Sequence, residues 1–343
     1  MFFWWRRTLR GGKMRRMKPH LISPTDRDEL SRLVIDAIDT VGIHRIVTKL
    51  STLSPRAIYE VESLVGCLPH VFARRQRWSW FRPATNRVIE VDPVHAPVLM
   101  FNRSGYVREA ALKAVNQLPD TPFFLAALVR RLNDWVEPVR RAAEESAKRE
   151  LPRLSTRTVV GTAPFLLERM AHWGRWSSPP AIVLDTLARP DCVHELVVQF
   201  EKTAEMPARV LRSALRFGLL DNHLLSMFRA AKRPEFRAVA LKAMLNSEVT
   251  WVTHYERQWV DKRYGRTRRV PILARRAIPR PAPVDVLIRQ GAADQSPLVR
   301  RTAAHGLVQH AASLSNIKRL MTLFDSDKSP SVRWCIEYLA QRQ

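Results

Sequence analysis

The sequence predicts an all-α protein, an α-solenoid in which helical hairpins stack one on the next, and three observations predict it. A Val-Arg pair followed by small residues at helical spacing recurs in residues 105–112, 137–149, 296–304 and 329–334. The arginines of neighbouring copies lie 32 residues apart at Arg108 and Arg140, and 33 apart at Arg300 and Arg333, a period expected of stacked helical hairpins. The apolar share of 46% is ample for a continuous core.

The stretch 137–149 shows why these copies are predicted to be helices. Pro138 suits the first turn of a helix, where its missing N–H is no loss. Small side chains then recur at helical spacing and form a narrow stripe, made of Val139, Ala142, Ala143, Ser146 and Ala147. Such a stripe lets neighbouring helices pack closely. In the middle of the chain the pattern is degenerate: the stretches that begin at Pro207 and Pro234 preserve the proline start but lose the Val-Arg pair.

The predicted organisation has six parts. In chain order they are a basic, aromatic and disordered tail (1–22), N-terminal helices (23–68), a basic and aromatic insertion (69–97), helical repeats (98–250), a basic insertion (251–283) and C-terminal helical repeats (284–343). Regular structure is predicted to begin at Ser23 and Pro24, where a capping residue precedes a first-turn proline.

Local patterns inside the two insertions predict little regular structure. Apolar and polar residues alternate over residues 88–91, but the stretch is too brief to form more than a short strand. Trp251, Tyr255 and Trp259 recur at the spacing of one helical face, which predicts a helix whose aromatic side chains lie in the core. Residues 264–283 are basic and punctuated by proline, which predicts a loop.

The formal net charge of +25 is concentrated in three short segments. Residues 1–20 carry a net charge of +7, residues 74–87 carry +5 and residues 251–281 carry +7, so 19 of the 25 charges lie in these segments. Clustered like charges repel one another, and a polyanionic partner offsets that repulsion. The charge distribution therefore predicts a partner such as nucleic acid.

The N-terminus and the cysteines bear on location. The apolar run from Phe2 to Trp5 is too short for a secretory signal or a transmembrane segment, although it could dip into a membrane interface. Three cysteines, at 67, 192 and 335, lie far apart and form no C-x-x-C pair, which fits a reducing cytoplasmic setting. A cytoplasmic protein is predicted, with a membrane-associated scaffold as the third-ranked alternative.

The proline-x-Val-Arg stretches, each preceded by an aspartate in a short turn, resemble HEAT repeats. Asp134, Asp294 and either Asp325 or Asp327 hold the turn position, and Arg140, Arg300 and Arg333 hold the helix position. The resemblance implies a right-handed α-solenoid whose second helices line a concave face. We expect the arginines to pair with the turn aspartates as a structural ladder. A fold of this kind specifies no chemistry.

Other cations of the predicted repeats lack an obvious partner and would project into the concave face: Arg141, Lys148, Arg212, Arg216 and Arg301. Cations along a curved groove suit a phosphate backbone, whose charges repeat every few ångströms. The alternative is a solvated basic face.

The two basic insertions supply the remaining candidates for nucleic-acid contact. In the first these are Arg74, Arg75, Arg77, Trp78, Trp80 and Arg82, and in the second Lys262, Arg263, Arg266, Arg268 and Arg269. Aromatic side chains among arginines could stack on unpaired bases. Alternatively, they cap hairpin turns.

Motifs for catalysis are missing from the sequence. It contains no phosphate-binding loop, no serine-hydrolase elbow and no H-E-x-x-H, so no catalytic residue, metal ligand or cofactor is predicted. HEAT-like DNA glycosylases exist, but no motif maps onto theirs. The sequence therefore predicts a non-enzymatic nucleic-acid-binding scaffold, for DNA or RNA. A scaffold that binds an acidic protein partner is the alternative, and a glycosylase is less favoured.

Overall fold

The computed structural model describes residues 21–36, 40–66, 73–75, 89–175, 180–202 and 206–342. Helices dominate, as predicted. The first half contains α1 (Pro24–Asp36), α2 (Thr40–Ser51), α3 (Ile58–Val65), α4 (Ala96–Leu99), α5 (Gly105–Ala114), α6 (Pro122–Arg131), α7 (Glu137–Glu150) and α8 (Thr156–Met170). The second half contains α9 (Ala181–Leu187), α10 (Pro190–Lys202), α11 (Ala208–Arg216), α12 (Leu224–Ala230), α13 (Pro234–Asn246), α14 (Val284–Ala292), α15 (Pro297–His310), α16 (Ile317–Met321) and α17 (Pro330–Ala340).

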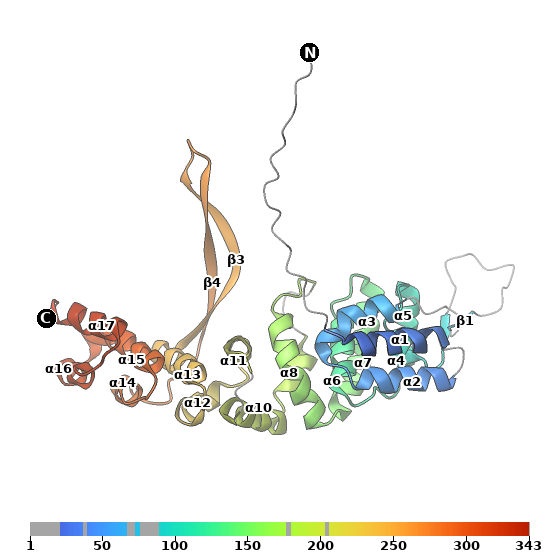
Figure 1. The fold of residues 1–343 in the computed structure, drawn as a ribbon, viewed down its shortest axis with the longest axis horizontal. Helices are drawn as coiled ribbons and strands as arrows, with labels where there is room; N and C mark the ends of the chain where they lie inside the picture. Colours follow the sequence, from blue (N-terminus) through green and yellow to red (C-terminus); the bar gives the residue numbers. More distant parts are fainter. Residues whose placement is uncertain are drawn as a thin grey trace, which may run out of the picture.

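The helices follow one another along an elongated, shallow arc, with the N-terminal helices at one end and α17 at the other (Figure 1). Alternate helices pack on each other, as in α5 on α7, α13 on α15 and α15 on α17, and sequential helices such as α12 with α13 and α14 with α15 also pack together. Each helix therefore buries its apolar stripe against near neighbours in the chain, and the core runs continuously along the molecule.

The structure corrects the predicted limits of two parts. Ile22 is buried and the backbone N–H of Leu21 donates to Glu60, so the fold begins two residues before the predicted start at Ser23. The first insertion pairs β1 (Ala73–Arg75) with β2 (Ile89–Val91) as a short antiparallel ribbon, and the brief alternation at 88–91 does mark a strand. Residues 95–97 are buried, so this insertion ends before the predicted limit.

Arginines and aspartates form the predicted ladder, with a connectivity that the sequence did not indicate. Arg108 donates from Nε and Nη2 to the carboxylate of Asp134, at 3.0 and 2.8 Å, and from Nη1 to two backbone carbonyls. The pairs Arg237–Asp294 and Arg300–Asp327 repeat this arrangement. Each carboxylate also accepts from the backbone N–H two residues further on.

Each ladder arginine thus reaches an aspartate 26 or more residues further along the chain. Two of the three predicted arginines, Arg140 and Arg333, do not pair with a turn carboxylate. Arg140 donates to the backbone carbonyl of Asp134, whose carboxylate is already occupied by Arg108 and Arg131. Arg333 is exposed, and no carboxylate of the described residues pairs with it. The hydrogen bond from Arg300 is the main cause that holds the pKa of Asp327 below its ordinary value.

The predicted helix at Trp251–Trp259 and the predicted loop at 264–283 are both wrong. They form one long antiparallel hairpin, β3 (Glu248–Asp261) paired with β4 (Arg266–Ala277), which we call the arm. β-branched and aromatic residues favour strands, and the turn ends on Gly265, whose φ of 61° suits glycine. Asp261 Oδ1 accepts from the backbone N–H groups of Arg263 and Tyr264 and closes the turn.

The arm is inserted into the run of helices between α13 and α14. Arg108 and Asp134 are 26 residues apart and Arg300 and Asp327 are 27 apart, but Arg237 and Asp294 are separated by 57. The separation of Arg237 and Asp294 exceeds that of Arg300 and Asp327 by 30 residues, which is the length of the stretch from Glu248 to Ala277. Ile278 N–H donates to the carbonyl of Ser247 at 2.9 Å, so the arm enters and leaves the array at the same point.

Candidate nucleic-acid interface

The predicted cations on α7 are already paired with acids of their own helix. Arg141 Nε lies 3.5 Å from Glu137, and Lys148 Nζ lies 2.9 Å from Glu145 and 3.4 Å from Glu144. All these side chains are largely exposed, so the pairs add little stability. The neighbouring carboxylates nevertheless reduce the positive potential of this face. Arg141 and Lys148 are therefore weak candidates for phosphate contact.

The predicted cations on α11 and α15 differ in their surroundings. Arg216 lies with its guanidinium carbon 5.1 Å from the ring centre of Trp251, and burial lowers its pKa from the ordinary arginine value. It supports the base of the arm. Arg212 and Arg301 are exposed, and among the described residues no carboxylate pairs with either. These two remain available for an anionic ligand.

Most of the first insertion lies outside the described residues. Arg77, Trp78, Trp80 and Arg82 fall there, so their predicted contacts stay predictions. Arg74 and Arg75 belong to β1, where the backbone of Arg74 pairs with Glu90 and that of Arg75 with Ile89.

The arm brings the candidates of the second insertion onto a projecting ribbon. Lys262 and Arg263 lie in its turn, Arg266 and Arg268 on one face of β4, and Arg269 on the other. All five are exposed. Side chains of a strand alternate between faces and directly paired residues share a face, so the register assigns each residue to a side of the ribbon.

One side of the arm, which we call the arginine face, combines cations with exposed aromatic and apolar side chains. It comprises Thr250, Val252, Tyr255, Arg257 and Trp259 of β3 with Thr267, Arg269, Pro271, Leu273 and Arg275 of β4. Every residue of the arm lies in the described part of the chain, and from Thr250 to Arg275 this face carries no acid. Tyr255 is 58% exposed and Trp259 is 60% exposed, whereas the sequence predicted them to be core.

Arg257 and Arg269 are direct cross-strand partners on the arginine face. Like charges placed opposite each other on adjacent strands destabilise a sheet, and no carboxylate on this face offsets them. Arg269 also lies 5.9 Å from the ring centre of Tyr255, so a flat aromatic surface and a guanidinium lie side by side. An anionic ligand with aromatic rings would satisfy both groups.

The opposite face of the arm has mixed charge. Its exposed part carries Arg266 and Arg268 together with Glu256 and Asp261. Arg268 Nη2 donates to Gln258 at 3.3 Å, and His254 Nε2 lies 3.3 Å from Glu256. The two arginines and two acids leave this part of the face without net charge, so the arginine face is the more basic of the two.

The base of the arm is attached to the array through α11 and the turn that follows it. Arg276 Nη1 and Nη2 donate to the two carboxylate oxygens of Asp221, at 2.6 and 2.9 Å, and Nη2 also donates to the carbonyl of Leu215. The hydrogen bond to Asp221 is the main cause that raises the pKa of Arg276. Together with the contact between Arg216 and Trp251, this ion pair sets the direction in which the arm leaves the helices (Figure 1).

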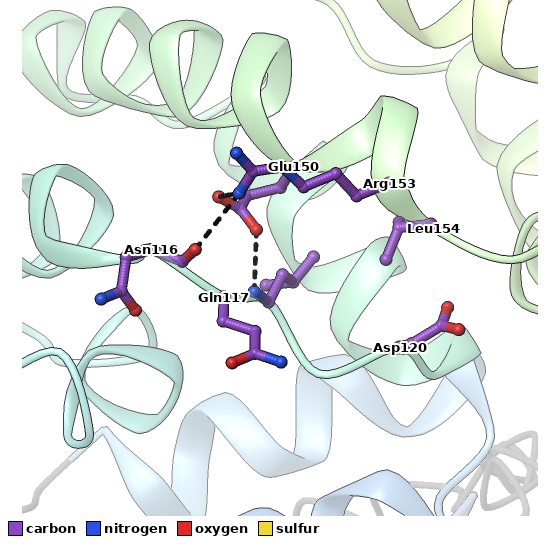
Figure 2. Close-up of a pocket in the computed structure, with 7 residues that line it drawn as sticks. Asn116, Gln117, Asp120, Glu150, Arg153 and Leu154 are labelled. Carbon is purple, nitrogen blue, oxygen red and sulfur yellow. Dashed lines mark hydrogen bonds and ion pairs between the residues drawn. The ribbon is translucent and has the colours of Figure 1, made fainter.

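A pocket of about 390 Å³ lies beside the loop that joins α5 to α6, and Figure 2 shows its polar side chains. Buried Glu150 accepts from the backbone N–H of Leu118 at 2.9 Å and lies 3.7 Å from Arg153, which in turn donates to the carbonyl of Asn116. The bond from Leu118 holds the loop against the end of α7.

Two further properties of the described residues bear on function. No group of three or more His, Cys, Asp and Glu side chains is placed to hold a metal ion within the described ranges. In the same part of the chain, no helix has both the length and the apolar character needed to cross a membrane.

The chain matches no protein-family model, and no curated protein is significantly similar to it.

Proposed function

We propose that this chain is a non-enzymatic nucleic-acid-binding scaffold, built as an α-solenoid of HEAT-like repeats that carries a basic arm. The packing of alternate helices and the ladder from Arg108 to Asp327 support the architecture, because a stack of repeats needs both side-by-side burial and a repeated link between neighbours. The net charge of +25 supports a polyanionic partner.

The arginine face of the arm is the observation that carries the proposal. It combines unpaired cations with exposed rings, and it projects away from the helices where a large ligand can reach it (Figure 1). Phosphates would neutralise the arginines and release counterions, while Tyr255 and Trp259 offer stacking surfaces. Exposed Arg212 on α11, a helix that packs against β3, is a further cation available to the ligand.

We expect nuclease-treated protein to bind labelled duplex DNA, single-stranded DNA or RNA in a fluorescence-anisotropy titration. Affinity should fall by about 100-fold or more between about 50 mM and about 200 mM salt, because a site that neutralises several phosphates loses its counterion-release advantage. An equally long polyglutamate chain serves as the control polyanion.

Absence of binding to every nucleic acid at the lower salt concentration would contradict the proposal. In that case the alternative of an acidic protein partner, represented here by polyglutamate, would take its place. Equal affinity for polyglutamate and nucleic acid would also count against a nucleic-acid function, since bases would then contribute nothing.

A further inference from the structure

We propose that the arm lies in the major groove of B-form duplex DNA, with Arg257 and Arg269 contacting backbone phosphates of one groove wall. This inference rests on the proposed function and specifies its ligand. The arm is the one described element whose dimensions and charge distribution can be compared directly with a nucleic-acid groove.

The length of the arm matches about one turn of duplex. Its exposed part runs from Val252 to the turn and back to Leu273. Ten residues of strand at about 3.3 Å each span about 33 Å, close to the pitch of B-form DNA of about 34 Å. A two-stranded ribbon is also narrow enough for the major groove, which is about 12 Å wide.

The distribution of cations favours a groove over a single strand. Arg257, Arg269 and Arg275 lie on the arginine face, and Arg266 and Arg268 lie on the opposite face together with Glu256 and Asp261. A ribbon inside a groove has a phosphate wall on each side, so cations are useful on both faces. A single strand would lie on one face and leave the other group of arginines in water.

The form of the duplex follows from the thickness of the arm. The major groove of A-form RNA is deep and narrow, and side chains cannot read it. The arm carries large side chains on both faces, including Tyr255 and Trp259 on one and His254 and Arg268 on the other. The major groove of B-form DNA admits a two-stranded ribbon, so it suits the arm better than the narrow groove of duplex RNA.

The pairing of Arg257 with Arg269 supports phosphate as the group they contact. Their charges repel each other across the ladder, and an isolated two-stranded hairpin is marginally stable in water. A phosphate placed between the guanidiniums converts the repulsion into two charge-assisted hydrogen bonds. The arm would therefore become more rigid when DNA binds.

The test compares two variants that remove equal charge. We expect Arg257→Ala with Arg269→Ala to weaken binding to a 30-base-pair duplex, of about three helical turns, by about tenfold or more. The matched control, Arg141→Ala with Lys148→Ala, should change it by less than about threefold, because those cations already have acidic neighbours. Far-UV circular dichroism checks that both variants keep their secondary structure.

A second variant tests the arm without disturbing its base. Residues 252–273 are replaced by Asn-Gly, a two-residue turn that joins the paired residues Trp251 and Ala274 and keeps the contacts of Arg276 with Asp221. This truncated-arm variant should lose the preference for duplex DNA over duplex RNA and single-stranded DNA of the same sequence. In the intact protein that preference should be about tenfold.

The outcomes separate the two proposals. If no nucleic acid binds the intact protein, the proposed function fails and the groove inference fails with it. If nucleic acid binds but duplex RNA or single-stranded DNA binds as tightly as duplex DNA, only the groove inference is overturned. Unchanged binding to duplex DNA whose major groove is filled by glucosylated hydroxymethylcytosine would overturn it as well.

Discussion

Arginine has two separate roles in this chain, and the environment of each guanidinium distinguishes them. In the ladder, Arg108 uses Nε and Nη2 on a carboxylate and Nη1 on backbone carbonyls, so its donors are occupied inside the protein. On the arm, Arg257 and Arg269 are exposed and face each other without an acid. Lysine could replace an arm arginine as a point charge, but it lacks the planar fork that the ladder geometry uses.

The ladder predicts a large effect of Asp134→Asn. Asp134 is the acid that neutralises Arg108, and the side chains of both are almost fully buried. Breaking a buried ion pair leaves an uncompensated charge, so we expect a loss of about 3–5 kcal/mol in the free energy of unfolding, measured by urea denaturation.

The matched control for this prediction is Asp325→Asn. Asp325 is exposed and lies two residues from the ladder aspartate Asp327. Its substitution should change the free energy of unfolding by less than about 0.5 kcal/mol. Similar losses for the two variants would show that the ladder adds no specific stability.

At the scale of the elements, close approach between helices depends on small residues at particular positions. Gly291 of α14 packs against Ala303 of α15, where a Cβ added at 291 would lie 2.8 Å from the Ala303 Cβ and 2.7 Å from Leu241. The methyl group of Ala303 cannot rotate away. The small-residue stripe recognised in the sequence thus sets the distance between these helices.

We expect Gly291→Ala to destabilise the protein even though alanine is the better helix former. The gain in helix propensity is about 1 kcal/mol, whereas overpacking costs about 1–3 kcal/mol. The net effect is a lower melting temperature, measured by differential scanning calorimetry. Gly174→Ala is the control, since nothing lies within 4 Å of a Cβ added there. A higher melting temperature for Gly291→Ala would mean that α14 and α15 can move apart without a loss of stability.

At the scale of the whole molecule, the array and the arm are separate in structure. The helices pack mainly on near neighbours in the chain, and Arg237 pairs with Asp294 across the arm in the same way as Arg300 pairs with Asp327. The exposed part of the arm contacts solvent on both faces. The helices therefore do not depend on it.

The truncated-arm variant should accordingly unfold at nearly the same temperature as the intact protein. We expect a shift of less than about 3 °C in the thermal transition followed at 222 nm, because the buried base and the ion pair between Arg276 and Asp221 are retained. A much larger drop would show that the arm stabilises the array, and the loss of DNA binding in this variant could then no longer be assigned to the arm alone.

The sequence by itself determined the helical class, the turn aspartates and the clustering of charge, because each depends on residues close together in the chain. The recurrent Val-Arg pair and the alanines after it indicate helices through local spacing alone. The prediction that Arg141 and Lys148 lack a partner was wrong, although the reason is local: Glu137, Glu144 and Glu145 stand three or four residues away on the same helix.

Only the tertiary structure decided the arm and the connectivity of the ladder. The spacing of Trp251, Tyr255 and Trp259 fits a helical face, and shifts in the strand register near Thr253 and Val260 interrupt the alternation that would have indicated a strand. Pairing with residues 266–277 decides between helix and strand, and that pairing is a contact between distant residues. Arg237 likewise pairs with Asp294 although the whole arm separates them in the sequence, because the chain returns to the same point of the array after 30 residues.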